Sequence, residues 1–471
     1  MELIGLCSAI AAVLFIGFNI LCLIMGRFDG LGITETVFIS YGIGIGFISL
    51  EMLLFYIAGW KFSIPALLLP WTAVVAAGLV IARKPLRSYW LTKQSQKIDC
   101  FGLRPRNDVI AISFLSVFLK FGIALEVAYA FFRALIRPIE AYDAVAIYAI
   151  KSKIFFLAKA IPETYFPSLV HGFPHPDYPL NIPLAETFIY MAMGSMNDQL
   201  VKIIFPLFFV GILVALYFAI RRFASRAYAL LFTFIIATIP QFNAYATNAY
   251  QELPLAFYCF TGSVFLFRWL ERRDDFRYLA LSAVMAALSA WTKNEGAMYC
   301  VINASIVLWA SLTARVRKGG SNKPVYAAAL YAFIIVLIIL PWAFIKRKYG
   351  IINDEINLAN LNPLYMVRQL HKLGPILYEL QKQLFGPKKW LILWPAVIAV
   401  AALKYKELFK GVTGYITASL VLAFCGYIVF YMISYVDVVF FASKTWSRFL
   451  LHLLPLTILW LACLLKEDIK L

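Results

Sequence analysis

The sequence predicts an all-α integral membrane protein with about thirteen transmembrane helices, and three observations support this class. Of the 471 residues, 62% are hydrophobic and 14% are charged, and the mean hydropathy is +0.80. A soluble domain would carry about a quarter charged residues. The apolar residues form runs of about 20, the length that crosses a bilayer as a helix. The basic residues gather in connections that all fall on one side of the predicted bundle.

The predicted spans follow one another along the whole chain. They occupy residues 4–25, 33–58, 63–82, 108–132, 201–220, 227–246, 252–270, 277–292, 295–312, 325–345, 390–403, 411–434 and 449–465. The first run lacks a basic region before it and a small-residue cleavage site after it, so we expect a retained span. The seven cysteines show no metal-type spacing, and we expect no cysteine chemistry.

Orientation follows from the lysines and arginines in the short connections, because such residues stay on the cytoplasmic side. Five connections are rich in them: 83–107, 221–226, 268–277, 313–324 and 404–410. With thirteen spans, all five fall on one side, which is predicted to be the cytoplasm. The N-terminus is then outside and the C-terminal tail inside. The net charge of +18 is no reason to expect a nucleic-acid partner.

The opposite, outer side carries two large loops, 134–200 and 346–389, and the first begins with the stretch 137–153. Acidic residues are scarce here, yet Glu140 and Asp143 lie three residues apart at the edge of a span. A carboxylate at that depth must be solvated, paired or used. The rest of the stretch predicts a short amphipathic helix on the membrane surface, with Asp143 in its first turn. Its candidate binding residues are Tyr142, Lys151 and Lys153.

The same loop continues into a proline-rich patch at residues 171–186. It contains His171, His175, Asp177, Tyr178 and Glu186. A residue that precedes proline is held in extended geometry, so the patch is predicted to be rigid and non-helical. One interpretation is a structural cap on the bundle. For His175 and Asp177 we favour a functional role.

Two tight outer turns carry charged residues between predicted spans. Glu252 follows one span and precedes another, where it could serve the site or only favour the helix N-terminus. Lys293, Asn294 and Glu295 place a cation, an amide and a carboxylate in a single turn. They could mark the water boundary, but a lysine is unexpected on the outer side, and we favour a functional role.

Further cations lie in the last two outer segments. Arg448 and His452 are four residues apart and therefore share one face of the last span. The loop 346–389 is rich in lysine and arginine, against the trend of the other outer segments. It could bind an anionic lipid headgroup, or a loop of this length could simply be translocated regardless of its charge.

Acidic, basic and imidazole side chains from four outer connections thus converge on one side of an apolar bundle. Catalysis on a membrane-anchored phosphate ester needs this combination: a carboxylate to take a proton from an acceptor hydroxyl, and cations or a metal to neutralise the departing phosphate. A secondary transporter is the competing class, but it should place ionisable groups near the bilayer midplane, often in repeated halves. A non-enzymatic lipid-binding or assembly protein is a third class, which does not need the paired carboxylates.

The motifs resemble those of bacterial membrane glycosyltransferases of the GT-C superfamily, which includes the protein O-mannosyltransferases and the lipid A aminoarabinose transferase. The resemblance rests on Asp143-Ala144, on His-Pro-Asp-Tyr-Pro-Leu at 175–180, on Lys-Asn-Glu-Gly at 293–296, and on Arg448. The similar branch has tryptophan where this chain has Tyr142, Val145 and Tyr148, so the substrate surface differs. The resemblance covers about residues 108–465.

The resemblance implies a division of the chain and a set of partners. Residues 1–107 would be a three-span addition with a basic cytoplasmic segment, 108–346 the GT-C-type core with its outer loop, and 347–471 an outer basic loop with three spans. The implied donor is a polyprenyl-phosphate-linked sugar, transferred with inversion to a lipid, glycan or protein acceptor at the outer face of a bacterial inner membrane. Many relatives need no metal, but His175, Asp177 and Glu252 could bind a divalent one.

The resemblance also distributes roles over the candidate residues. The acid of the first outer loop, Asp143, would be the general base, with Glu140 as its near alternative. The other candidates for the catalytic site are His175, Asp177 and Glu252. The substrate-binding candidates are Tyr142, Lys151, Lys153, Tyr178, Lys293, Asn294, Glu295, Arg448 and His452.

Overall fold

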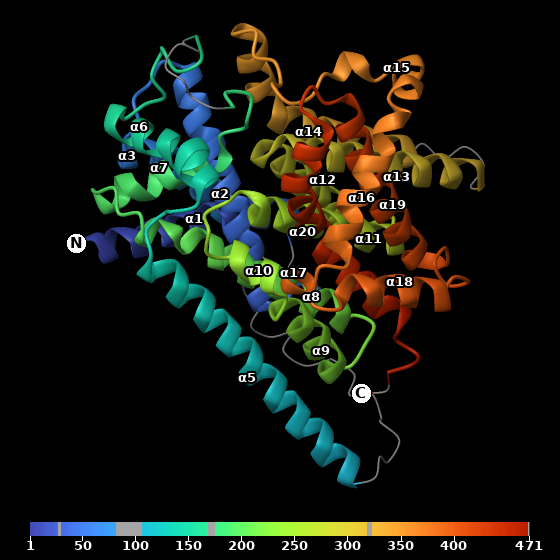
Figure 1. The fold of residues 1–471 in the computed structure, drawn as a ribbon. Helices are drawn as coiled ribbons and strands as arrows, with labels where there is room; N and C mark the ends of the chain where they lie inside the picture. Colours follow the sequence, from blue (N-terminus) through green and yellow to red (C-terminus); the bar gives the residue numbers. More distant parts are fainter. Residues whose placement is uncertain (27–29, 82–105, 168–174, 318–322, 470) are drawn as a thin grey trace.

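The computed structural model describes residues 1–26, 30–81, 106–167, 175–317, 323–469 and 471 (Figure 1). Within these residues the backbone is helical almost throughout, and its β-type pairing is an isolated bridge between Ile356 and Ser434. The predicted all-α class is therefore confirmed. Most of the predicted basic segment 83–107 and the position of His171 lie outside the described residues.

Among the described residues, nine helices are long and apolar enough to cross a membrane. They are α1 (Glu2–Met25), α2 (Ile33–Ile57), α5 (Arg106–Ile136), α8 (Ile204–Arg221), α11 (Glu252–Glu271), α13 (Asn294–Arg317), α14 (Lys323–Lys348), α19 (Gly411–Ile433) and α20 (Val438–Leu464). Each corresponds to a predicted span, so the multi-pass membrane architecture is confirmed.

The predicted count of thirteen is not confirmed, because four expected spans are outside this set. They form α3 (Ile64–Ile81), α9 (Arg226–Ala237) with α10 (Pro240–Tyr245), α12 (Phe276–Thr292) and α18 (Leu393–Leu403). The expected span 227–246 breaks because Ile239, which precedes Pro240, is extended at φ −69° and ψ 118°. Helix α12 has 17 residues and lies against α11, α13 and α14 in the core.

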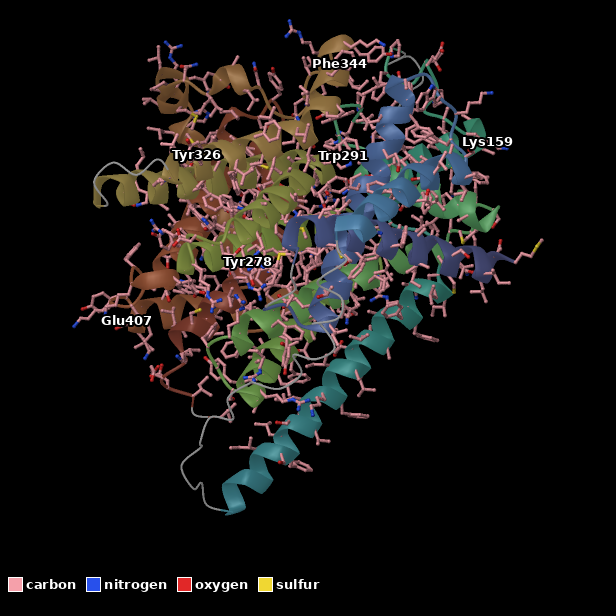
Figure 2. All side chains as sticks on the ribbon, turned by 180° about the vertical axis from the view of Figure 1, so that it is seen from behind. Lys159, Tyr278, Trp291, Tyr326, Phe344 and Glu407 are labelled. Carbon is pink, nitrogen blue, oxygen red and sulfur yellow. The ribbon has the colours of Figure 1, made fainter. Side chains whose placement is uncertain are left out.

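Burial separates central helices from peripheral ones. All of the apolar window of α11 is buried, against 11% of that of α5 and 22% of that of α14. Figure 1 shows α5 running away from the other helices toward its N-terminal end. In Figure 2, Trp291 lies in the interior, whereas Tyr326 and Phe344 of α14 stand on the outside and are exposed. Exposed apolar faces of this kind are expected where helices meet lipid.

The alternation of helices places the candidate residues at one end of the bundle. The C-terminal ends of α5, α12 and α14 and the N-terminal ends of α11 and α20 share this end, which is opposite to the basic connections 221–226, 268–277 and 404–410. Figure 2 shows Lys159, from the first predicted outer loop, and Glu407, from a predicted cytoplasmic connection, at opposite ends of the molecule.

The first predicted outer loop contains the expected short helix, whose helical geometry begins at Tyr142. A π-helical turn (Ala144–Ala149) leads into α6 (Ile150–Ala158), and α7 (Asn181–Met193) follows. Asp143 has helical geometry and lies in the first turn as predicted, although its side chain does not cap the helix. Its carboxylate contacts a different helix, α20. The prediction that the patch 171–186 is non-helical is wrong at its end, because α7 begins at Asn181.

The last outer segment differs from its prediction as well. Residues 435–448 were expected to form a connection, but α20 begins at Val438, because the side chain of Asp437 accepts a hydrogen bond from the backbone N–H of Phe440 and caps the helix. Arg448 consequently lies about three turns inside α20. The loop 346–389 holds the short helices α15 (Pro363–Arg368), α16 (Leu373–Leu384) and α17 (Pro387–Trp390).

Candidate active site

Asp143 and Arg448 form the most direct contact among the predicted site residues. One terminal guanidinium nitrogen of Arg448 lies 2.5 Å from a carboxylate oxygen of Asp143. The side chains of Arg448 and Asp143 are 22% and 19% exposed, so a ligand can reach both. The contact joins the first outer loop to the last span, across 305 residues of sequence.

Arg448 is held from two further sides. Its other terminal nitrogen lies 3.6 Å from Glu252, whose side chain is completely buried at the start of α11. The guanidinium also lies over the ring of Tyr250, 5.0 Å from the ring centre, in the turn before α11. A guanidinium over an aromatic face is attracted by the ring as well as by the two carboxylates. Arg448 is thus a fixed cation, and one of its terminal nitrogens faces the partly exposed Asp143.

Lys293 extends the same charge cluster toward α12 and α13. Its ammonium lies 3.1 Å from Glu252 and 2.8 Å from Glu295, and only 4% of its side chain is exposed. The carboxylate oxygen of Glu252 that faces Lys293 is also the one nearest Arg448. Three carboxylates and two cations from four separate parts of the sequence therefore form one series of contacts, Asp143–Arg448–Glu252–Lys293–Glu295.

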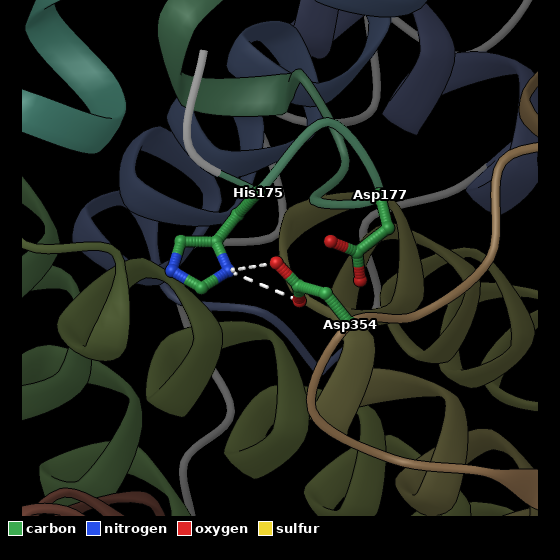
Figure 3. Close-up of side chains that lie close together, drawn as sticks. All are labelled: His175, Asp177 and Asp354. Atoms are coloured by element: carbon green, nitrogen blue, oxygen red, sulfur yellow. Dashed lines mark hydrogen bonds and ion pairs between the residues drawn. The ribbon is translucent and has the colours of Figure 1, made fainter. Parts of the chain in front are cut away.

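The His-Pro-Asp-Tyr-Pro segment forms a second polar cluster beside the first. Nδ1 of His175 lies 3.0 Å from Asp354, in the segment after α14. Figure 3 shows the imidazole against Asp354, with the Asp177 carboxylate on the other side of Asp354. One oxygen of Asp177 accepts hydrogen bonds of 2.7 Å from the amides of Asn294 and Asn353.

The other oxygen of Asp177 is buried and has no hydrogen-bond partner within the described part of the chain. Each of His175, Asp177 and Asp354 offers one possible ligand atom, and these three atoms lie within 4.8 Å of one another. Imidazole nitrogen and carboxylate oxygen are the donor types that a divalent transition metal uses. The cluster could therefore hold a metal. The third ligand would be Asp354 and not Glu252, which the sequence suggested, because Glu252 is paired with Lys293 and Arg448.

The ionisation of this second cluster follows from its surroundings. Burial, with the nearby charge of Asp354, raises the pKa of Asp177 to about 6. Burial opposes the charged form of His175, but the hydrogen bond with Asp354 and the charges of the nearby carboxylates together outweigh it and raise the pKa of His175. The same contact lowers the pKa of Asp354, against the effect of its burial. His175 and Asp354 therefore favour an ion pair in the absence of a ligand.

Lys151 holds the segment that contains His175 and Asp177 in place. It is buried in α6 and donates a hydrogen bond of 2.9 Å to the backbone carbonyl of His175, whose φ of +56° is left-handed. Burial lowers the pKa of Lys151 to about 7, although Asp177 and Asp354 act in the opposite direction. Tyr178 stacks on His175 and donates to Glu355 at 3.2 Å. These contacts give Lys151 and Tyr178 a role in fixing the loop.

Three predicted site residues stand apart from both clusters. Glu140 is exposed and pairs with Arg137 at 3.2 Å, three residues earlier. Lys153 pairs with Asp198 at 2.7 Å. Tyr142 has no part in these contacts and is 81% exposed beside Asp143. Its exposed ring is accessible from outside the molecule.

His452 lies one turn below Arg448 on the same face of α20. It is buried, and its Nδ1 is 2.9 Å from the hydroxyl of Tyr427, which in turn lies 3.2 Å from the hydroxyl of Tyr299. Its Nε2 is buried and without a hydrogen-bond partner among the described residues. The tyrosine pair fixes the ring, so Nε2 is the atom that remains free for a ligand or a water molecule.

The sequence analysis missed several residues of these clusters. They are Tyr250, Tyr427, Asn353, Asp354 and Glu355. Asn353, Asp354 and Glu355 had a visible signal, since they form an Asn-Asp-Glu run in a loop otherwise rich in cations. Tyr250 adjoins the turn that carries Glu252. Tyr427 lies inside an apolar run and had no signal.

Comparison with known proteins adds one finding. Residues 177–342 match the family model described as dolichyl-phosphate-mannose-protein mannosyltransferase. This is a GT-C family, so the predicted resemblance is confirmed. No individual curated protein and no solved structure gives a match. The matched stretch contains Asp177, Glu252 and Lys293, whereas Asp143 and Arg448 lie outside it.

Proposed function

Taking the chain as a membrane glycosyltransferase of the GT-C type, we propose that it moves a sugar from a polyprenyl-phosphate-linked donor to an acceptor hydroxyl. The observation that carries this proposal is the contact between Asp143 and Arg448. It brings a partly exposed carboxylate against a fixed, partly exposed cation at an end of the bundle. A proton acceptor and a phosphate-binding group are the two elements that such a transfer requires.

The proposed reaction is a single displacement with inversion at the anomeric carbon. The acceptor oxygen forms a bond to that carbon while its proton passes to Asp143. The bond between the carbon and the phosphate oxygen breaks, and polyprenyl phosphate leaves with the electron pair. Asp143 is the preferred base because Glu252 is completely buried and held by two cations, and Glu140 faces away into an exposed pair with Arg137.

The cations of the first cluster stabilise the charge that develops on the phosphate. Arg448 is the cation that a phosphate meets first, since its side chain is 22% exposed against 4% for Lys293. Glu252 is a positioning residue, because it holds Lys293 and Arg448 on either side of one carboxylate oxygen. His452 adds its free Nε2 on the same face of α20.

The remaining candidates bind or shape the substrate site. Tyr142, which is exposed beside the base, contacts the acceptor, which can be a lipid, a glycan or a protein. Asn294 and Glu295 couple the two clusters, because Asn294 donates to Asp177 while Glu295 pairs with Lys293. Lys153 pairs with Asp198 and is 34% exposed, and we assign it to acceptor binding as well.

A divalent metal is a further part of the proposal, at His175, Asp177 and Asp354. The support is the buried, unpartnered oxygen of Asp177 within 4.8 Å of donor atoms of the other two residues. A bound metal would supply positive charge near the phosphate without any change in protonation. Binding of Zn²⁺ or Mn²⁺ to metal-stripped protein, measured by calorimetry, should be lost in Asp354→Asn and retained in Glu140→Gln.

The outward side of a bacterial inner membrane is the proposed location of the site. Its support is the position of the basic connections at the other end of the bundle. The function itself is tested by incubating the purified protein with radiolabelled polyprenyl-phosphate sugars and extracts of cell-envelope acceptors. Label should move from the lipid phase to an acceptor. Retention of all label on the lipid with every sugar would contradict the proposal.

A further inference from the structure

We infer that Asp143 and the lipid phosphate compete for Arg448, so that Asp143 acts both as the base and as the group that expels the product. This inference rests on the proposed function, since it takes the donor to be a polyprenyl-phosphate sugar. It adds a step that the general base role does not include, namely release of polyprenyl phosphate driven by the return of the Asp143 charge.

The first support is the geometry of Arg448. Its two terminal nitrogens have different partners, Glu252 at 3.6 Å and Asp143 at 2.5 Å. Glu252 is completely buried and Tyr250 lies under the guanidinium at 5.0 Å, so that side stays in place when a ligand arrives. The nitrogen toward Asp143 faces a carboxylate that is itself 19% exposed, whereas the other faces the completely buried Glu252. A phosphate oxygen can therefore replace the Asp143 carboxylate without moving the arginine from its anchor.

The second support is the charge balance of the first cluster. In their ionised forms, the carboxylates of Asp143, Glu252 and Glu295 exceed the cations Arg448 and Lys293 by one negative charge. A phosphodiester donor would add another negative charge, and like charges at such distances repel strongly where water is scarce. The phosphate and the Asp143 carboxylate therefore cannot both be held on Arg448 at full strength.

The chemical step changes this balance in a definite order. The donor is a phosphodiester with one negative charge, whereas the product is a phosphate monoester with about 1.5 to 2. The proton that leaves the acceptor hydroxyl neutralises Asp143 at the moment when the phosphate gains its additional charge. Arg448 then binds the product more tightly than it bound the donor. When Asp143 loses that proton to solvent, its carboxylate pairs with Arg448 again and displaces polyprenyl phosphate.

The test measures the affinity of the purified protein for a short-chain fluorescent polyprenyl phosphate in nanodiscs made of a neutral lipid. In Asp143→Asn the competing carboxylate is absent, so the dissociation constant should fall by about 10-fold, as expected when one charge competitor is removed from a partly buried site. Glu140→Gln is the matched control, since it removes a neighbouring carboxylate that pairs elsewhere. Its affinity should equal that of the unchanged protein.

A double-mutant cycle assigns the effect to Arg448. Arg448→Ala should weaken binding, and adding Asp143→Asn to it should tighten binding by much less than in the unchanged protein, because without the arginine only the repulsion between like charges remains. Equal or weaker binding by Asp143→Asn would overturn the inference but leave the proposed donor standing. The same tightening in the Arg448→Ala background would also overturn it. If no variant, nor the unchanged protein, binds the polyprenyl phosphate, both the inference and the proposed donor class fail.

Discussion

Lys293 and Glu252 form an ion pair at 3.1 Å in which both side chains are almost completely buried. A buried pair is worth little compared with apolar residues of the same shape, but the loss of one partner leaves an uncompensated charge. Lys293 also contacts Glu295 at 2.8 Å, whereas Glu252 has Arg448 at the longer distance of 3.6 Å. Lys293 therefore keeps a closer partner when Glu252 is removed than Glu252 keeps when Lys293 is removed.

This asymmetry predicts how substitutions affect stability. Lys293→Met should lower the free energy of unfolding by about 3–5 kcal/mol, because Glu252 then stays buried with Arg448 alone, at the longer distance of 3.6 Å. Glu252→Gln should have a smaller effect, since Lys293 keeps Glu295. The double variant Glu252→Gln/Lys293→Met should recover much of the loss. Thermal unfolding of the detergent-solubilised protein gives the measurement.

The exposed pair Lys410–Glu407 provides the control for this experiment. Its lysine and glutamate side chains are 65% and 48% exposed, so Lys410→Met should change the unfolding temperature little. If Lys293→Met were as stable as Lys410→Met, the charge of Glu252 would have to be relieved in some other way. The ion pair would then lose its structural role.

The second prediction concerns which end of the bundle is outside. The native cysteines are first replaced, and Asn360→Cys and Glu407→Cys are made separately; Glu407 is exposed at the end opposite to the site. A membrane-impermeant maleimide applied from the periplasmic side should label position 360 and not position 407. Labelling at position 95, in the basic segment 83–107, should resemble that at 407. The reverse pattern would place the site in the cytoplasm and remove the basis of the proposed orientation.

The third prediction concerns Glu186, which is buried in α7 and accepts a hydrogen bond of 2.5 Å from Ser152 in α6. Burial raises the pKa of Glu186 to about 8, although the hydrogen bond from Ser152 acts in the opposite direction. Between its ordinary pKa and pH 8, the folded state thus binds more protons than the unfolded state. The free energy of unfolding should therefore fall as the pH rises from about 5 to 8.

Glu186→Gln keeps the shape and removes the titration. Its unfolding temperature should depend less on pH over this range, whereas Glu140→Gln, which alters an exposed carboxyl, should follow the unchanged protein. An identical pH dependence in all three proteins would show that Glu186 does not bind the proton. The expected result would make Glu186 a structural contact between α6 and α7 and not a catalytic acid.

The sequence was most informative where motifs are local. Lys293, Asn294 and Glu295 were recognised as one charged turn, and in the structure Lys293 lies between α12 and α13 while Asn294 and Glu295 begin α13. Arg448 and His452 share a helix face because their spacing requires it. The helical class followed from hydropathy, since a bilayer leaves the backbone few alternatives to helix.

Contacts between distant segments were not predictable in the same way. His175 and Asp354 are 179 residues apart, and only the packing of α14 against the bundle brings them together. The start of α20 depended on the single cap at Asp437, and the break before Pro240 on one residue of extended backbone. Hydropathy averages over many residues and does not resolve such boundaries.

The last prediction concerns Asp143, the proposed base. It is partly exposed, lies beside the exposed Tyr142, and its carboxylate is 2.5 Å from Arg448. Asp143→Asn keeps the side-chain shape and removes the basicity, so turnover should fall by about 100- to 10,000-fold, the usual contribution of a positioned proton acceptor. Donor binding should persist, because the base acts on the acceptor hydroxyl.

Glu140→Gln separates this role from a general effect of negative charge. Glu140 lies three residues earlier but is exposed and pairs with Arg137, so its variant should keep near-normal turnover. Initial rates of sugar transfer are compared for both variants at saturating donor, with equal amounts of monodisperse protein. Near-normal turnover in Asp143→Asn together with a large loss in Glu140→Gln would exchange the two assignments. A large loss in Asp143→Asn alone, with donor still bound and the loss also present in a single turnover, is the pattern expected for a base at position 143.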